Sequence, residues 1–146
     1  MQQFEKVIQN PELDCAILVD IDWTIAEKWD RSPFEWNKVW NDTPHLDIID
    51  LVKVLSEHYE IIFVSGRSDI CFNETIDWLK KYFGFGIELY MRKDWDFRKD
   101  DLVKYEILNE LIKENYVEFC IDDRDQVVKM YRESGVRVLQ VAEWNF

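Results

Sequence analysis

The chain has 146 residues, of which 30 are Asp or Glu and 18 are Lys or Arg, so its formal net charge is −12. A hydrophobic content of 47%, with seven Trp, is enough to bury a core, and this excludes a disordered acidic tail. A surface this acidic repels nucleic acid over most of its area, so a polyanionic partner would need a local basic site.

Five short apolar runs, most of them rich in β-branched residues, predict strands along the chain. The stretches between them have helical spacing and predict helices near residues 46–55, 76–83, 102–112 and 127–131, the last ending at Ser134-Gly135. This alternation predicts an α/β fold, a three-layer Rossmann-like parallel sheet with helices on both faces. The predicted strands are Cys15–Val19, Ile61–Val64, Ile87–Met91, Val117–Ile121 and Val136–Val141.

The chain shows no repeat, no low-complexity segment and no visible linker, so we expect one domain over residues 1–146, with about residues 1–14 as an N-terminal extension. About 40 residues separate Thr24 from Ser65, and 36 separate Arg67 from Lys104, which leaves room for a small flap but not for a large cap. Three cysteines without metal-ligand spacing, and the lack of a signal or membrane segment, favour a cytoplasmic protein with no membrane partner.

Carboxylates follow two of the predicted strands. Asp20 and Asp22 come after the first strand, and Asp122 and Asp123 come after the fourth. The carboxyl ends of parallel strands are where site residues collect, so these acids are expected in one small volume, where their charges repel. A divalent cation would relieve that repulsion. An all-oxygen ligand set favours Mg²⁺ over Zn²⁺, for which the chain has no grouped His or Cys.

Carboxylates beside Mg²⁺ are suited to phosphoryl transfer. One carboxylate can attack phosphorus to form an aspartyl-phosphate, and a second can act as general acid and base. The phosphoryl oxygens then need cations and hydrogen-bond donors, and Ser65, Arg67 and Lys104 are of the right types.

Structural roles are open for the same residues. Acids after strands also serve as loop residues or helix caps, and Asp100 could cap the helix that it opens. Lys104 and Arg67 could be solvated surface charges. Four Trp lie between residues 23 and 40: the spacing of Trp36 and Trp40 favours packing on a short helix, whereas Trp23 and Trp29 could pack or stack on bases.

The order Asp20-x-Asp22-x-Thr24, Ser65, Lys104, Asp122-Asp123 resembles the four-motif pattern of the haloacid-dehalogenase-like phosphohydrolases. Two longer strings, Arg98–Lys104 and Ile121–Val128, together with Gln140-Val141-Ala142, resemble the phosphatase domain of phage polynucleotide kinase-phosphatases. The resemblance covers roughly residues 16–146. It implies a haloacid-dehalogenase-like core and a phosphoric monoester hydrolase.

Residue roles follow from the resemblance position by position. It implies Asp20 as nucleophile and Asp22 as general acid and base. Mg²⁺ would be held by Asp20, the Asp22 carbonyl and Asp122, with Asp123 supporting that shell. Ser65 and Lys104 would bind the phosphoryl group, and Asp100 would orient Lys104. The arginines that would contact the substrate are Arg31, Arg67 and Arg92.

The implied reaction is removal of a 3′-phosphate from an RNA, DNA or nucleotide end, including a 2′,3′-cyclic end, in nucleic-acid repair. The resemblance suggests a phage enzyme working in the host cytoplasm, with room for a separate kinase or ligase partner. The kinase half of the family is missing, because the chain has no Gly-rich loop ending in Gly-Lys-Ser/Thr. Trp23 also replaces the Gly that is usual between the second Asp and the Thr.

Two other functions are compatible with these residues. A mononucleotide phosphatase would use the same chemistry. A receiver-type signalling module also combines a parallel sheet, Mg²⁺ and a phosphorylated Asp, but in such modules the adjacent acidic pair usually ends the first strand, whereas here it follows the fourth. The segment Arg92–Lys104 holds five basic and four acidic residues and is the best candidate for a local basic site.

Overall fold

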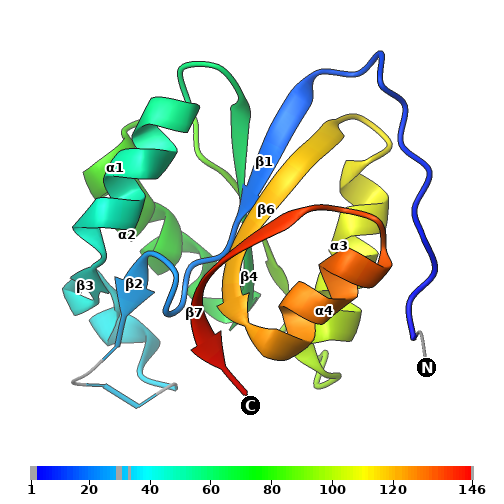
Figure 1. The fold of residues 1–146 in the computed structure, drawn as a ribbon. Coiled ribbons are helices and arrows are strands. Elements are labelled where there is room, and N and C mark those ends of the chain that lie inside the picture. Colours follow the sequence, from blue (N-terminus) through cyan, green and yellow to red (C-terminus); the bar gives the residue numbers. More distant parts are fainter. Residues whose placement is uncertain (1–2, 29–30, 33, 146) are drawn as a thin grey trace.

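The computed structural model describes residues 3–28, 31–32 and 34–145 and confirms the predicted α/β fold. Its main sheet has five parallel strands in the order β5-β4-β1-β6-β7, so β1 lies at the centre (Figure 1). The chain leaves β1 toward β4 on one side and returns toward β6 on the other. The strands are β1 (Cys15–Val19), β4 (Glu60–Ser68), β5 (Glu88–Arg92), β6 (Tyr116–Arg124) and β7 (Val138–Trp144).

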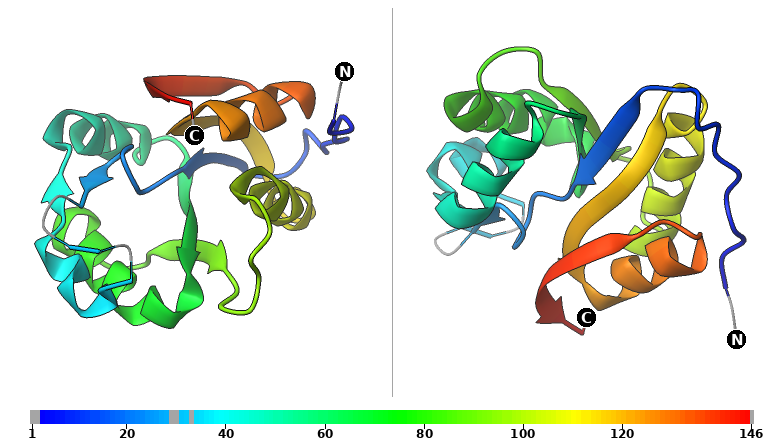
Figure 2. Two further views of the ribbon diagram at one scale, coloured as in Figure 1. Left: turned by 90° about the horizontal axis from the view of Figure 1, so that it is seen from below. Right: turned by 45° about the horizontal axis from the view of Figure 1, so that its top comes forward.

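Helices cover both faces of this sheet (Figures 1 and 2). Successive residues of β1 point to opposite faces, so Leu18 packs in one core and Ile17 in the other. The Leu18 core includes residues of α3 (Asp100–Leu111) and α4 (Asp125–Glu133), and the Ile17 core includes residues of α1 (Leu46–Leu55) and α2 (Phe72–Phe83). Strands buried on both faces explain why the sequence shows continuous apolar runs rather than alternation.

β4 and β6 continue three or four residues past the apolar runs that predicted them. The register shifts between Ser65 and Ser68 in β4, and between Asp122 and Arg124 in β6. These shifts place the polar residues on irregular ends of strands rather than on the loops that follow. Such bulges re-aim side chains at the rim of a sheet and are common beside functional sites.

A small flap connects β1 to α1. Its elements are β2 (Ala26–Glu27), the 3₁₀ helix η1 (Trp36–Asn41) and β3 (Thr43–Pro44), and β2 pairs with β3 in antiparallel fashion. The spacing of Trp36 and Trp40 therefore predicted a short helix correctly. Trp36 packs against the core beneath the flap, whereas Trp40 is 51% exposed and lies under the ammonium of Lys81. Trp29 lies outside the described residues.

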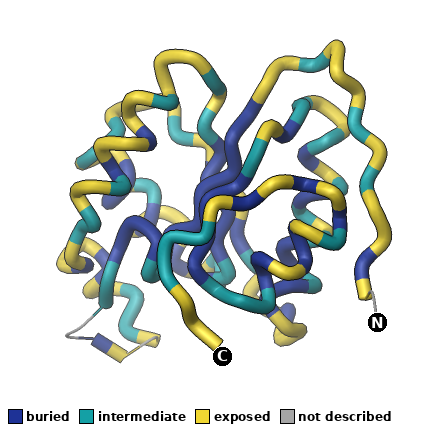
Figure 3. Tube along the Cα trace, viewed as in Figure 1, coloured by how far each residue is buried: buried dark blue, intermediate teal, exposed yellow. Residues whose placement is uncertain are grey.

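The segment before β1 is tied to the α3 and α4 side of the sheet. Phe4 is buried in that core, and Val7 donates its backbone N–H to the carbonyl of Ser134. Gln9 exchanges two hydrogen bonds with the backbone of Val117 at the start of β6. Figure 3 shows the buried residues concentrated on the central strands. None of the helices in the described ranges is long and apolar enough to cross a membrane.

Truncating Ile17 should destabilise the fold strongly. Ile17 is fully buried on the central strand, and Ile17→Ala is expected to lower the free energy of unfolding by about 2–5 kcal/mol, because it leaves a cavity. Ile8→Ala is the matched control, since Ile8 is 93% exposed and its loss should change stability by less than about 0.5 kcal/mol. Urea unfolding followed by circular dichroism measures both, and equal effects would contradict the placement of Ile17.

Candidate active site

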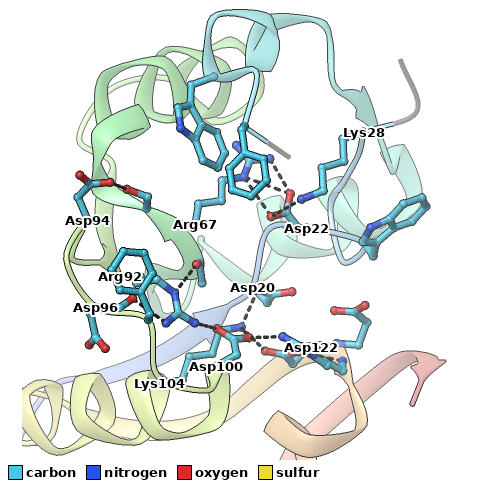
Figure 4. A pocket seen from close by; sticks show the side chains of 18 residues that line it. Asp20, Asp22, Lys28, Arg67, Arg92, Asp94, Asp96, Asp100, Lys104 and Asp122 are labelled. Carbon is cyan, nitrogen blue, oxygen red and sulfur yellow. Dashed lines mark hydrogen bonds and ion pairs between the residues drawn. The ribbon is translucent and has the colours of Figure 1, made fainter. Parts of the chain in front are cut away.

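Asp20 follows β1 directly, at the point in the sheet where the strand order reverses direction. Asp20 is 6% exposed, and its carboxylate is held from two sides: Lys104 donates to Oδ1 over 2.7 Å, and Thr24 donates to Oδ2 over 2.8 Å. Crevices at such switch points are the usual ligand sites of open α/β sheets. Figure 4 shows Asp20 between two groups of side chains, one around Asp22 and one around Lys104.

Lys104 joins the carboxylates of three different elements. Its ammonium lies 2.7 Å from Asp20 Oδ1, 2.9 Å from Asp122 Oδ2 and 3.7 Å from Asp100 Oδ2. Burial alone would lower the pKa of this lysine, but the charges of Asp122 and Asp20 hold it well above its usual range. Lys104 therefore stays charged and is a structural part of the carboxylate cluster, not a solvated surface residue.

The remaining carboxylate oxygens leave a place for a cation. Oxygens of Asp20, Asp122 and Asp123 lie within 4.8 Å of one another. Asp123 Oδ1 accepts from Thr24, whereas Asp123 Oδ2 is buried and receives no hydrogen bond within the described part of the chain. Burial, followed by the charge of Asp122, raises the pKa of Asp20 well above its usual range. An oxygen-only set with one orphaned oxygen fits a hard divalent cation.

Asp22 faces the other side of the site and is bound by Arg67. The guanidinium donates to both Asp22 oxygens, with the shortest contact 2.7 Å, and Lys28 lies 3.7 Å away. Burial would raise the pKa of Asp22, but Arg67 outweighs it and lowers the pKa to about 2. In this arrangement Asp22 is a carboxylate and carries no proton to donate.

Arg31 is not among the residues described as lining the cleft around Asp20 and Asp22. Its guanidinium is 2.7 Å and 2.9 Å from the two oxygens of Asp42, and both side chains are buried. Asp42 also accepts from Arg67 over 2.7 Å, so one carboxylate holds two arginines. Asp42 was not among the residues predicted from the sequence, because a single acid between a 3₁₀ helix and a two-residue strand carries no motif. Arg31 and Arg67 were both expected to contact the substrate, and nothing in their spacing pointed to a shared acid.

Ser65 and Gly66 lie on the irregular end of β4 and have different roles. Ser65 is fully buried, and its Oγ accepts from the backbone N–H of Arg67 over 3.1 Å. Gly66 lines the cleft, and a Cβ added there would lie 2.1 Å from Asp100 Oδ1. Any side chain at position 66 would therefore displace the Asp100 carboxylate, and only the place of Gly66 between Ser65 and Arg67 hinted at this in the sequence.

Asp100 is the meeting point of three cations. Besides Lys104, Arg92 lies 3.5 Å and Arg124 3.6 Å from its carboxylate. Arg92 also donates to the carbonyl of Gly66 over 2.9 Å, which ties the end of β5 to β4. Asp100 is the first residue of α3 and not its N-cap, which is Lys99, so its carboxylate serves the contact with Lys104 and does not cap the helix.

Most of the charged side chains described above line one cleft of about 700 Å³. Seven acidic and five basic residues are among its described lining residues, so the acids remain in excess unless a cation joins them. Aromatic side chains form part of the walls. The lining residues are Asp20, Asp22, Trp23, Lys28, Phe34, Trp36, Gly66, Arg67, Ser68, Arg92, Asp94, Asp96, Phe97, Asp100, Lys104, Asp122, Asp123 and Arg124.

Comparison with known proteins identifies relatives over nearly the whole chain. Residues 14–146 match the family described as the polynucleotide kinase PNKP phosphatase domain. A protein of Autographa californica nuclear polyhedrosis virus, named as a bifunctional polynucleotide kinase/RNA ligase, is 38% identical over 123 residues, which are 81% of this chain and 18% of the viral protein.

Solved structures give the same result. A chain in the structure of the Pnkp1/Rnl/Hen1 RNA repair complex is 30% identical, with a TM-score of 0.87, and the match covers 100% of this chain and 48% of that one. A haloacid dehalogenase-like hydrolase from Streptococcus pneumoniae, 13% identical with a TM-score of 0.58, covers 86% of this chain and 83% of its own, and shows the shared fold. The chain thus spans half or less of the viral relative and of the repair-complex chain.

Adding a methyl group at Gly66 should disable the cleft through Asp100. The Cβ of Gly66→Ala would collide with the Asp100 carboxylate, which helps to hold Lys104, and we expect kcat on p-nitrophenyl phosphate to fall about a hundredfold. Asp100→Ala removes the collision, so adding Gly66→Ala to that variant should cost little more. A double-mutant cycle of kcat values tests this, and additive losses would show that Gly66 acts by another route.

Proposed function

The chain belongs to the family of polynucleotide kinase PNKP phosphatase domains and is a haloacid-dehalogenase-like phosphatase. On that premise we propose that it hydrolyses 3′-phosphate ends of nucleic acids, including 2′,3′-cyclic ends. We propose RNA as the main substrate. The observation that carries the proposal is the Asp20 carboxylate, fixed by Lys104 and Thr24 on the floor of an open cleft. The naming of one relative's assembly as an RNA repair complex supports RNA as the substrate.

Asp20 is the proposed nucleophile. One of its oxygens forms a bond to phosphorus while the bond from phosphorus to the 3′ oxygen breaks, which gives an aspartyl-phosphate. Water then attacks the phosphorus and releases inorganic phosphate and the free carboxylate. The contacts from Lys104 and Thr24 support this role, because they fix the carboxylate in one orientation and so reduce the entropic cost of attack.

Mg²⁺ would be held by Asp20, the Asp22 carbonyl and Asp122, with Asp123 completing or supporting the set. The orphaned oxygen of Asp123 and the spacing of the three carboxylates support this assignment. When bound, Mg²⁺ supplies positive charge to the carboxylates and to the phosphoryl oxygens. Lys104 and Arg67 supply the remaining positive charge around the phosphoryl group, Arg92 extends the basic wall, and Ser65 fixes the backbone of Arg67.

Asp22 is proposed to give a proton to the leaving 3′ oxygen and later to take one from the attacking water. This requires that Arg67 release it. A dianionic phosphate is a stronger bidentate partner for a guanidinium than a single carboxylate, so substrate binding would draw Arg67 from Asp22 to the phosphoryl oxygens. When Arg67 moves away, the largest lowering influence on the pKa of Asp22 is lost and burial acts to raise that pKa against Lys28 and Arg31, which would prepare Asp22 as an acid. Substrate binding would thereby switch on the proton donor.

The partners of the relatives suggest a setting for this reaction. A relative in the structural comparison is part of a complex named Pnkp1/Rnl/Hen1, and the viral relative is named as a kinase/ligase. We propose that this phosphatase works beside a kinase or a ligase, because a ligase needs a 3′-hydroxyl that phosphate removal provides. A separate chain or a connected domain would both meet that need.

Removing the nucleophile should abolish phosphate release. Asp20→Asn is expected to lower kcat on a 3′-phosphorylated RNA oligonucleotide by at least about 10⁴-fold, because an amide cannot form the phospho-enzyme. Asp50→Asn on the exposed side of α1 is the control and should keep wild-type activity. Retained phosphate release by Asp20→Asn would overturn the nucleophile assignment.

The preferred substrate separates this proposal from a nucleotidase. We expect kcat/KM to be higher for 3′-phosphorylated RNA than for free 3′- or 5′-mononucleotides, because the cleft is open to a polymer end. Matched RNA and DNA oligonucleotides with 3′-phosphate or 2′,3′-cyclic ends complete the set. A preference for 5′-mononucleotides would favour the mononucleotide phosphatase, and a single turnover without further release would favour a signalling module.

Loss of Asp123 should weaken Mg²⁺ binding. Asp123→Asn is expected to lower the affinity about 10- to 100-fold, because it removes the charge of the buried oxygen in this carboxylate cluster that receives no hydrogen bond from the described residues. The rise of the unfolding temperature with Mg²⁺ concentration measures this affinity without an activity assay. Asp50→Asn again serves as the control, and an unchanged Mg²⁺ response in Asp123→Asn would contradict the site.

A further inference from the structure

Trp23 occupies a backbone conformation that side chains rarely adopt. Its φ is 63°, and it is the one described residue other than glycine with a positive φ. This left-handed region is disfavoured for residues with a Cβ and is sterically free only for glycine. A bulky residue held there is strained, and such strain clusters at ligand sites. A glycine at position 23 would form this turn without strain. We therefore infer that the indole has a role other than forming the turn.

A second tryptophan supports the ring of Trp23 from a distant part of the chain. Trp144, near the end of β7, lies 5.4 Å from Trp23 between ring centroids at an interplanar angle of 53°. The register of the sheet places Trp144 opposite Arg124, which lines the cleft. Trp23 itself lines the cleft, whereas Trp144 is not among its described lining residues. Trp144 therefore packs on Trp23 from outside and helps to hold it at the cleft wall.

We propose that Trp23, backed by Trp144, is a stacking platform for the nucleobase of the terminal nucleotide. This inference rests on the proposed function, since it concerns the base attached to the sugar whose 3′-phosphate lies on Asp20. Trp23 directly follows Asp22, so its ring stands beside the phosphoryl site in the same cleft. An indole stacks on any base, which suits an enzyme that must accept ends of different sequence.

The proposal explains why the turn carries Trp despite its strain. A ring that only filled space would be better placed on an unstrained residue. Ile21 and Ile25, on either side of the turn in sequence, are fully buried in the core, whereas Trp23 lines the cleft. Exposed Trp40 differs from Trp23 in both respects: it lies outside the described lining of the cleft and has an ordinary φ. Trp40 is therefore the matched control for loss of an indole.

The experiment compares two RNA oligonucleotides that end in a 3′-phosphate and differ only in whether the terminal nucleotide carries its base. For the wild-type protein we expect KM to be about 5- to 20-fold lower with the base present. In Trp23→Gly, which fits a φ of 63° and so should fold, this ratio should fall to about one. Trp144→Ala should reduce the ratio partially, and Trp40→Ala should leave it at the wild-type value.

Each outcome decides between the proposals. Loss of the base-dependent ratio in Trp23→Gly, with the ratio kept in Trp40→Ala, supports the platform. An equal ratio in the wild type and Trp23→Gly overturns it, and a change in unfolding temperature alone would show that the indole serves only packing. If the wild type releases no phosphate from either RNA but acts on p-nitrophenyl phosphate, both the proposed RNA substrate and the stacking platform are wrong. If the wild type releases phosphate from both RNAs with equal KM, the stacking platform is overturned and the proposed function stands.

Discussion

The buried ammonium of Lys104 is the interaction on which the rest of the site depends. Asp20, Asp122 and Asp100 come from three separate elements, and their charges would repel one another in a space from which water is largely excluded. Lys104 offsets this repulsion and fixes the distances between them. A buried charge of this kind costs desolvation, which is tolerable only because three carboxylates surround it. The arrangement lowers the stability of the fold, but it holds the carboxylates in fixed positions that could bind a cation.

A second charged network fixes the opposite wall and joins it to the flap. Asp42 binds Arg31 and Arg67 at once, and Arg67 in turn binds Asp22. The indole N–H of Trp78 in α2 donates to the carbonyl of Asp42, so the network is anchored in the core. Arg67 thus has two carboxylate partners of different character: Asp42 is buried, whereas Asp22 is more accessible and, in the proposed mechanism, gives way to a phosphate. A positioned but exchangeable arginine is what a phosphoryl site requires.

Much of the fold followed from the sequence because each segment carries a strong local signal. The apolar runs, the helical stripes and the Ser134-Gly135 stop correspond to strands and helices of the structure, because a sheet buried on both faces demands continuous apolar strands. The strand order and the irregular ends of β4 and β6 were beyond prediction, since they depend on pairing between segments distant in sequence. Asp42 and Gly66 were missed for the same reason: their importance lies in contacts with distant residues, Arg31 and Asp100, that no spacing reveals.

The net charge of −12 places a final constraint on what the cleft can bind. Much of the positive charge of the segment Arg92–Lys104, the candidate basic site, is paired within the protein. Arg98 pairs with Asp96 and Glu106, and Lys104 lies inside the carboxylate cluster. Little of that charge is left to follow a long phosphate backbone, which normally requires a row of free cations. In the proposed function, attraction is therefore concentrated on the terminal phosphate, where Arg67, Lys104 and a divalent cation would act together. Beyond that phosphate the acidic surface would repel the strand, and the proposed stacking on Trp23 would hold the terminal nucleotide, because stacking requires no charge.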